Sequence, residues 1–78
     1  MPTVLLINGY RFFFFSNERN EPMHIHIEKA EKYAKFWIQP LFVAVNVGFT
    51  GKELREIGEI IDKNEVLIRD KWNEHFGK

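Results

Sequence analysis

Two histidines separated by one residue are the side chains best suited to chemistry in this sequence. Residues 23–28 read MHIHIE, so His24, His26 and Glu28 alternate with Ile25 and Ile27. Successive side chains of a strand point to opposite faces. The pattern therefore predicts a strand with one apolar face and one face whose imidazole and carboxylate groups could transfer protons or bind a metal ion.

A second alternating segment follows a charged turn at residues 29–32 and runs from residue 33 to residue 38, YAKFWI. Together the two segments predict an antiparallel hairpin, and a slip by one residue would place the isoleucines opposite Lys35 and Trp37. The predicted pairs are Glu28 with Tyr33, Ile27 with Ala34, His26 with Lys35, Ile25 with Phe36 and His24 with Trp37. The predicted binding surface comprises His24, His26, Glu28, Tyr33, Lys35 and Trp37.

The row of His24, His26 and Glu28 could form either of two kinds of site, a metal site or a catalytic site. His24 and His26 stand near enough to bind one metal ion, and Glu28 or His75 could add a third ligand. The predicted position of Lys35 beside His26 disfavours a cation there, so we expect no metal and no other cofactor. Alternatively, His24, His26 and Lys35 could transfer a proton and support a phosphate, which is the chemistry of a metal-independent ribonuclease.

Recognition without catalysis is the interpretation that the residue types favour. Tyr33 and Trp37 could stack on bases beside the cation of Lys35, or the same surface could contact a protein partner with Trp37 as its anchor. A further alternative is that the histidines are ordinary exposed strand residues beside Trp37.

Composition limits the class of protein. The chain has 78 residues, eleven acidic and eleven basic side chains, and no cysteine. This length predicts a single domain, and the balanced charge provides no field that would steer the molecule onto nucleic acid or a membrane. No segment has the length and hydropathy of a membrane span or of a signal peptide. We therefore expect a soluble cytoplasmic protein without disulfides.

The first 15 residues predict a second hairpin. Asn8 and Gly9 separate an aliphatic segment, residues 3–7, from an aromatic one, residues 10–15, and this dipeptide is typical of a two-residue turn. The expected pairs are Ile7 with Tyr10, Leu6 with Arg11, Leu5 with Phe12, Val4 with Phe13 and Thr3 with Phe14. Because both faces of this hairpin are apolar, helices could cover one face and a second copy of the chain the other.

The remaining residues complete an α+β fold. Residues 16–22 predict a surface loop, and residues 23–28, 33–38 and 41–47 predict strands, the last of them covered on both faces. Thr50 and Glu53 form a capping-box pattern before a helix at residues 51–63, and Asn64 is a suitable N-cap for a second helix at residues 65–76. We predict a five-stranded antiparallel meander with C-terminal helices packed on one face.

The ordered segments MPTVLLINGYRFFFFSNE, EPMHIHIE, AKFWIQP, GFTGKELREI and KWNEHFG resemble the small bacterial family of domains of unknown function called DUF4160. The resemblance spans nearly the whole chain and includes the His-x-His motif at His24 and His26. It implies no established activity. It does imply a gene neighbour that encodes another small protein, an arrangement similar to toxin and antitoxin pairs. We therefore expect a binding or regulatory module with a protein partner, or a ribonuclease-type toxin.

Overall fold

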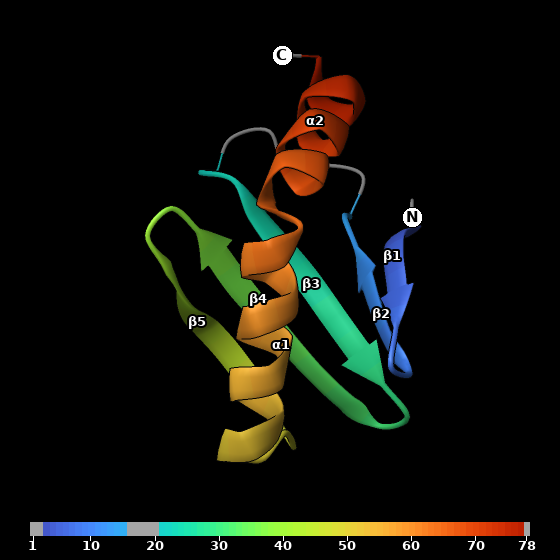
Figure 1. The fold of residues 1–78 in the computed structure, drawn as a ribbon, viewed down its shortest axis with the longest axis vertical. Coiled ribbons are helices and arrows are strands. Elements are labelled where there is room, and N and C mark those ends of the chain that lie inside the picture. The colour runs from blue at the N-terminus through green and yellow to red at the C-terminus, as the bar shows by residue number, and fades with distance from the viewer. Residues whose placement is uncertain (1–2, 16–20, 78) are drawn as a thin grey trace.

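Five strands and two helices make up the protein (Figure 1), whose computed structural model describes residues 3–15 and 21–77. The prediction of an α+β fold with a five-stranded antiparallel sheet is confirmed. The elements are β1 (Thr3–Ile7), β2 (Tyr10–Phe13), β3 (His24–Lys29), β4 (Lys32–Ile38), β5 (Leu41–Val47), α1 (Gly51–Lys63) and α2 (Glu65–Phe76).

The strands lie in the order β1-β2-β3-β4-β5, so each strand pairs with its neighbours in sequence. In Figure 1, α1 crosses one face of the sheet and α2 continues beyond the end of the sheet at which β3 begins. None of the helices in the described part of the chain is both long and apolar enough to span a membrane.

The central hairpin has the predicted register. All five expected pairs between β3 and β4 are present, from Glu28 with Tyr33 to His24 with Trp37. The turn is shorter than predicted, because Lys29 and Lys32 also pair and leave Ala30 and Glu31 as the loop. Ala30 has a φ of 55°, so an alanine occupies the left-handed region that a two-residue turn of this kind requires.

The first hairpin differs from the prediction at its open end. Asn8 and Gly9 form the turn with φ values of 55° and 83°, and the three pairs nearest to it are those expected. Thr3, however, pairs with Phe13 instead of Phe14, because Val4 is an extra residue in a β-bulge. β2 ends at Phe13, two residues earlier than predicted. Most of the predicted 16–22 loop, residues 16–20, lies outside the described residues.

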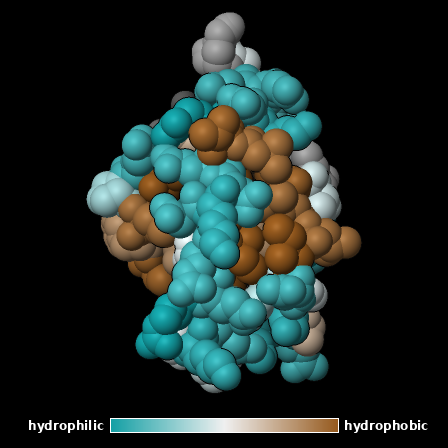
Figure 2. All heavy atoms as spheres, in the orientation of Figure 1, coloured by the Kyte–Doolittle hydropathy of each residue, from teal (hydrophilic) through white to brown (hydrophobic). Residues whose placement is uncertain are grey.

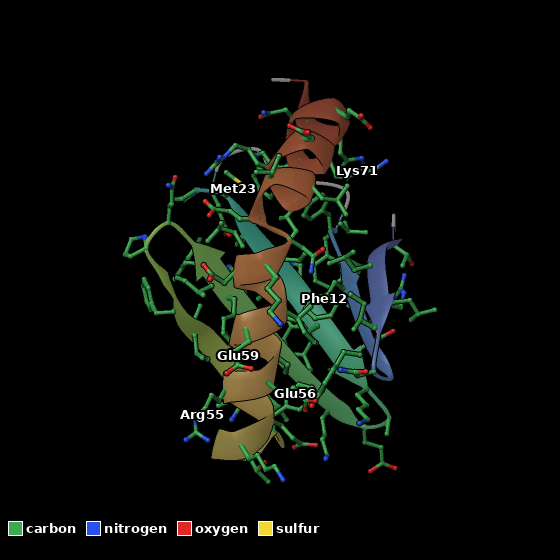
Figure 3. All side chains as sticks on the ribbon, viewed as in Figure 1. Phe12, Met23, Arg55, Glu56, Glu59 and Lys71 are labelled. Atoms are coloured by element: carbon green, nitrogen blue, oxygen red, sulfur yellow. The ribbon has the colours of Figure 1, made fainter. Side chains whose placement is uncertain are left out.

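The hydrophobic core lies between α1 and the sheet. Ile57, Ile60 and Ile61 form the buried stripe of α1, at the spacing typical of one helix face. In Figure 3, Phe12 lies on the inner side of the sheet, while Glu59 is on the outer surface of α1. Further buried residues of the core are Tyr10, Ile25, Ile27, Ala34, Phe36 and Ile38 from the sheet and Phe14, which follows β2.

The aromatic run of β2 is covered within the chain. Phe12, Phe13 and Phe14 are buried, and Phe15 is half-buried. The phenylalanines of the first hairpin therefore do not provide the exposed surface for a second copy that the sequence suggested.

The helix boundaries agree with the prediction, and one cap differs. Thr50 accepts a hydrogen bond from the Glu53 amide, and Glu53 accepts one from the Thr50 amide, so the predicted capping box is present. Asn64 does not cap α2 with its side chain. Its Nδ2 instead donates to the carbonyl of Ile60 at 2.8 Å, which closes the last turn of α1. Gly77 ends α2 in the left-handed conformation.

Candidate interaction surface

The sheet face opposite α1 carries all six residues of the predicted binding surface. We call it the histidine face. The strand registers define it as three rows: Leu6, Arg11, Glu28, Tyr33 and Val47; then Thr3, Phe13, His26, Lys35 and Val45; and finally His24, Trp37 and Phe42.

A β-bulge in β5 decides which residues join this face. Lys35 pairs with Val45 whereas Phe36 pairs with Val43, so Ala44 is an extra residue in the edge strand. Without a bulge, Phe42 would lie on the opposite face from Val45, since their positions differ by an odd number. With it, Phe42, Val45 and Val47 share one face, and all three are exposed.

His26 is buried by aromatic rings. Its ring stacks between Phe13 and Tyr33 at centroid distances of 5.5 Å and 5.8 Å, and Phe15 packs against it at 4.2 Å. Its Nδ1 lies 2.7 Å from the Tyr33 hydroxyl, at hydrogen-bonding distance. Only 2% of the surface of His26 is accessible to solvent. His26 is therefore not an ordinary exposed strand residue, which was one of the alternatives considered from the sequence.

His24 is fully buried at the end of the sheet. Trp37 contacts its ring from β4 and Trp72 from α2, with centroid distances of 5.5 Å and 5.2 Å. Its Nδ1 lies 2.8 Å from the Pro22 carbonyl, and because a carbonyl only accepts hydrogen bonds, Nδ1 carries a proton. His24 therefore links the segment before β3 to the sheet and to α2.

The cations of the histidine face are paired with carboxylates. Arg11 donates from Nη1 to Glu28 at 2.8 Å, and its guanidinium lies 4.5 Å from the centre of the Phe13 ring. Lys35 donates to Glu21 at 2.8 Å, and its ammonium lies 4.5 Å from the centre of the Trp37 ring. A phosphate group would have to compete with these carboxylates for either cation.

The positions of the histidine and carboxylate side chains are relevant to the metal site and the catalytic site that the sequence left open. Within residues 3–15 and 21–77, no three histidine, aspartate or glutamate side chains converge to hold a metal ion. Glu28 points to Arg11, and the His75 ring stacks on Phe14. Both histidines of the motif are covered by neighbouring side chains, so neither reaches a substrate in this conformation.

A small hollow opens beside Trp37. It has a volume of about 230 Å³ and is lined by Pro22, Trp37, Gln39, Pro40 and Phe42. Its lining is aromatic and aliphatic except for Gln39. Pockets that enclose small-molecule ligands usually measure about 300–1,000 Å³, so this hollow suits a single apolar side chain better than a metabolite.

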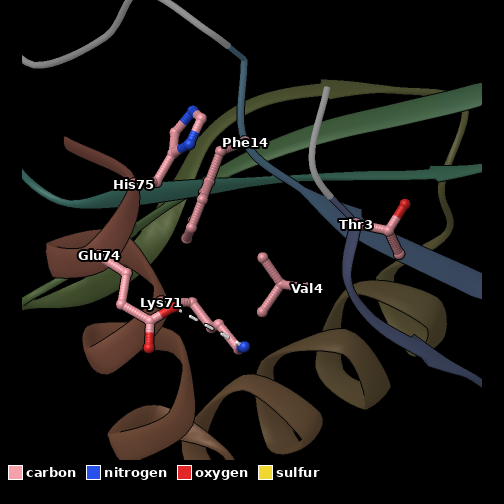
Figure 4. Close-up of a pocket in the computed structure, with 6 residues that line it drawn as sticks. All are labelled: Thr3, Val4, Phe14, Lys71, Glu74 and His75. Atoms are coloured by element: carbon pink, nitrogen blue, oxygen red, sulfur yellow. Dashed lines mark ion pairs between the residues drawn. The ribbon is translucent and has the colours of Figure 1, made fainter.

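A second cavity, of about 320 Å³, lies between the N-terminal hairpin and α2 (Figure 4). Lys71 and Glu74 form an ion pair of 3.9 Å on its α2 side, and Phe14 lies opposite them. Its remaining lining residues are Thr3, Val4 and His75. Lys71 and Glu74 are exposed on α2 and pair with each other. These described residues therefore do not give the cavity a set of polar groups that converge on a ligand.

The groups with shifted pKa values lie at the α1 side of the sheet, not on the histidine face. Burial and a 2.8 Å hydrogen bond to Glu56 raise the pKa of Tyr10 to about 12. The Lys32 ammonium and the Thr50 amide, which both bond the Glu53 carboxylate, hold the pKa of that carboxyl below its usual value. Both groups stabilise the packing of α1.

Residues 9–73 match the family model described as Domain of unknown function (DUF4160). The chain belongs to the DUF4160 family. No curated protein and no solved structure matches the chain significantly. Membership of DUF4160 therefore assigns the chain to a family but does not assign it an activity.

For this DUF4160 chain, sequence reasoning placed six residues on one face correctly but missed others that share it. Phe42 was missed because the bulge at Ala44 brings it to the same face as Val45 and Val47, and the sequence analysis assigned no face to these three residues. Gln39 and Pro40 were identified only as a break between strands, and they also line the hollow. The sequence pattern of residues 39–47 indicated neither the bulge nor the hollow.

Proposed function

We propose that this DUF4160 chain is a protein-binding module of a toxin–antitoxin-type pair, and that its partner binds the histidine face at the hollow beside Trp37. The single observation that carries the proposal is this hollow, which is apolar, sized for one side chain and bordered by the half-exposed Phe42. Aromatic side chains in such pockets dominate the binding energy of many protein interfaces.

The charges of the face support a protein partner over nucleic acid. Arg11 and Lys35 each bind a carboxylate at 2.8 Å, so among the described residues of the face these two cations are neutralised and form no free basic groove. Single-stranded nucleic acid binding usually requires unpaired cations along the path of the backbone. The whole chain also has a formal charge of zero, which provides no long-range attraction for phosphates.

The type of pair comes from the family resemblance and not from the geometry. The resemblance to DUF4160 implies a small protein encoded by the neighbouring gene, and that protein is the partner we propose. A ribonuclease role receives no support from the site, because His24 and His26 are enclosed by rings and Lys35 is engaged by Glu21.

Binding of the purified chain to the purified product of its genomic neighbour tests the proposal. We expect Trp37→Ala and Phe42→Thr each to weaken binding by about tenfold or more, because each removes one wall of the hollow. Val66→Thr is the matched control, since Val66 is an exposed apolar residue of α2 and should leave affinity unchanged. Equal affinities for all three variants and the wild type would exclude this surface.

Induction of the chain in a bacterial host, alone and with its neighbour, tests the type of pair. If the chain is one member, growth should change when the two genes are expressed together compared with either alone, and Trp37→Ala should abolish the difference. RNA cleavage by the purified chain that survives Trp37→Ala would instead favour a nuclease and contradict a binding module.

A further inference from the structure

β5 is an apolar strand that this chain leaves exposed. Its sequence, LFVAVNV, predicted a strand covered on both faces, yet Val43 alone is half-buried and the other six residues are exposed. The exposed fractions of its large residues are 38% for Leu41, 50% for Phe42, 42% for Val45 and 56% for Val47. The prediction of coverage is therefore wrong for the isolated chain.

The outer edge of β5 is also unpaired in the described part of the chain. β5 is the last strand of the sheet, with β4 on one side and no described strand on the other. In the view of Figure 2, apolar side chains lie beside the hydrophilic surface of α1, on the side of the molecule where Figure 1 shows β5. The seven residues of β5 include no lysine, glutamate or proline, which often block pairing with another strand, and the bulge at Ala44 is the one such device within the strand.

A second copy of the same strand has the properties that this edge requires. It is extended, apolar on both faces and equally unpaired, and antiparallel pairing about a two-fold axis satisfies both edges in one contact. The four exposed side chains amount to roughly 300 Å² per copy at sizes typical of apolar residues. Edge-to-edge pairing would bury the backbone edges and the flanks of these side chains, which places the contact at the low end of the sizes of specific interfaces.

We infer that two copies of this chain associate through β5 to form one continuous antiparallel sheet. The two-fold axis would place both histidine faces on the same side of that sheet. Phe42, Val45 and Val47 of one copy would then lie beside those of the other and form a wider apolar surface. Association does not depend on the proposed partner, and we expect it to be half complete at micromolar chain concentration, which corresponds to about 8 kcal/mol.

Sedimentation equilibrium of the purified full chain tests the inference without any partner. The mass should rise from that of one chain, 9.3 kDa, toward twice that value as the concentration rises through the micromolar range. Ala44 is the exposed bulge residue in the middle of β5, so Ala44→Lys would bring two ammonium groups close together across the axis. We expect this variant to dimerise at least tenfold more weakly.

Two controls make the result specific to β5. Ala44→Ser adds a polar group without charge and should dimerise like the wild type. Val66→Lys adds the same charge to an exposed apolar residue of α2 and should also dimerise normally. Circular dichroism of Ala44→Lys should show unchanged helix content, which separates loss of pairing from loss of folding.

Three results would overturn the inference. The first is a wild-type chain that remains monomeric up to millimolar concentration. The second is an Ala44→Lys variant that dimerises as tightly as the wild type. The third is dimerisation lost in Val66→Lys and retained in Ala44→Lys, because the interface would then lie on α2.

Discussion

The hydroxyl of Tyr33 lies 2.7 Å from Nδ1 of His26, and this contact joins β3 to β4 on the face opposite the helices. Around it, Phe13 and Phe15 enclose the imidazole ring. The histidine that sequence reasoning regarded as a candidate catalyst is thus part of an aromatic cluster. Its position is that of a residue that holds strands together.

Tyr33→Phe tests this structural role of His26. The variant keeps the ring that stacks on His26 and removes the hydroxyl, so it should lower the free energy of unfolding by about 1 kcal/mol, the usual net value of one hydrogen bond. Urea denaturation monitored by fluorescence measures the change. The double variant with His26→Phe reports the coupling between the two side chains, and additive effects would mean that the contact contributes nothing.

Tyr10→Phe should alter stability at alkaline pH. The folded pKa of Tyr10 is raised from 10.0 to about 12, so the unfolded chain releases its proton at lower pH than the folded chain. The associated stability is complete below pH 10 and is lost as the pH rises toward 12. Thermal melting between pH 9 and pH 12 should show a smaller alkaline decrease for Tyr10→Phe than for the wild type. Parallel pH profiles would contradict the assignment to Tyr10.

Glu53→Gln should alter stability at acidic pH. The pKa of Glu53 is lowered from the ordinary 4.5 by Lys32 and the Thr50 amide, so its contribution is present above pH 4.5 and is lost as the pH falls below that value. Glutamine preserves a capping box but carries no charge to titrate. Melting temperatures between pH 2 and pH 6 should therefore depend less on pH in Glu53→Gln, whereas Glu59→Gln, exposed on α1, should follow the wild type.

Gly58→Ala should stabilise the protein. Gly58 lies within α1, and a Cβ built there would approach Cε2 of Phe36 at 4.0 Å, an ordinary van der Waals distance. Replacing a helical glycine with alanine should therefore raise the free energy of unfolding by about 1 kcal/mol. Gly48→Ala provides the contrast, because Gly48 has a φ of 96° and its Cβ would lie 3.1 Å from Cγ of Lys32. A gain in stability at position 48, or a loss at position 58, would contradict these environments.

The sequence by itself determined the elements and the pairing of the central hairpin. Strict alternation allowed one register in which Ile25 and Ile27 meet Ala34 and Phe36, because any slip by one residue would bury charge. The turn at Asn8 and Gly9 and the capping box at Thr50 were also readable, since each depends on neighbouring residues alone. Local chemistry was sufficient for these features.

Only the tertiary structure decided which faces are covered. Alternation places His24 and His26 on one face, but their burial depends on Phe15 and Trp72, which come from outside the central hairpin. The bulge at Ala44 shifts the alternation within β5 and moves Phe42 to the histidine face. Burial and register across distant strands are set by packing between elements, and no pattern within one element specifies that packing.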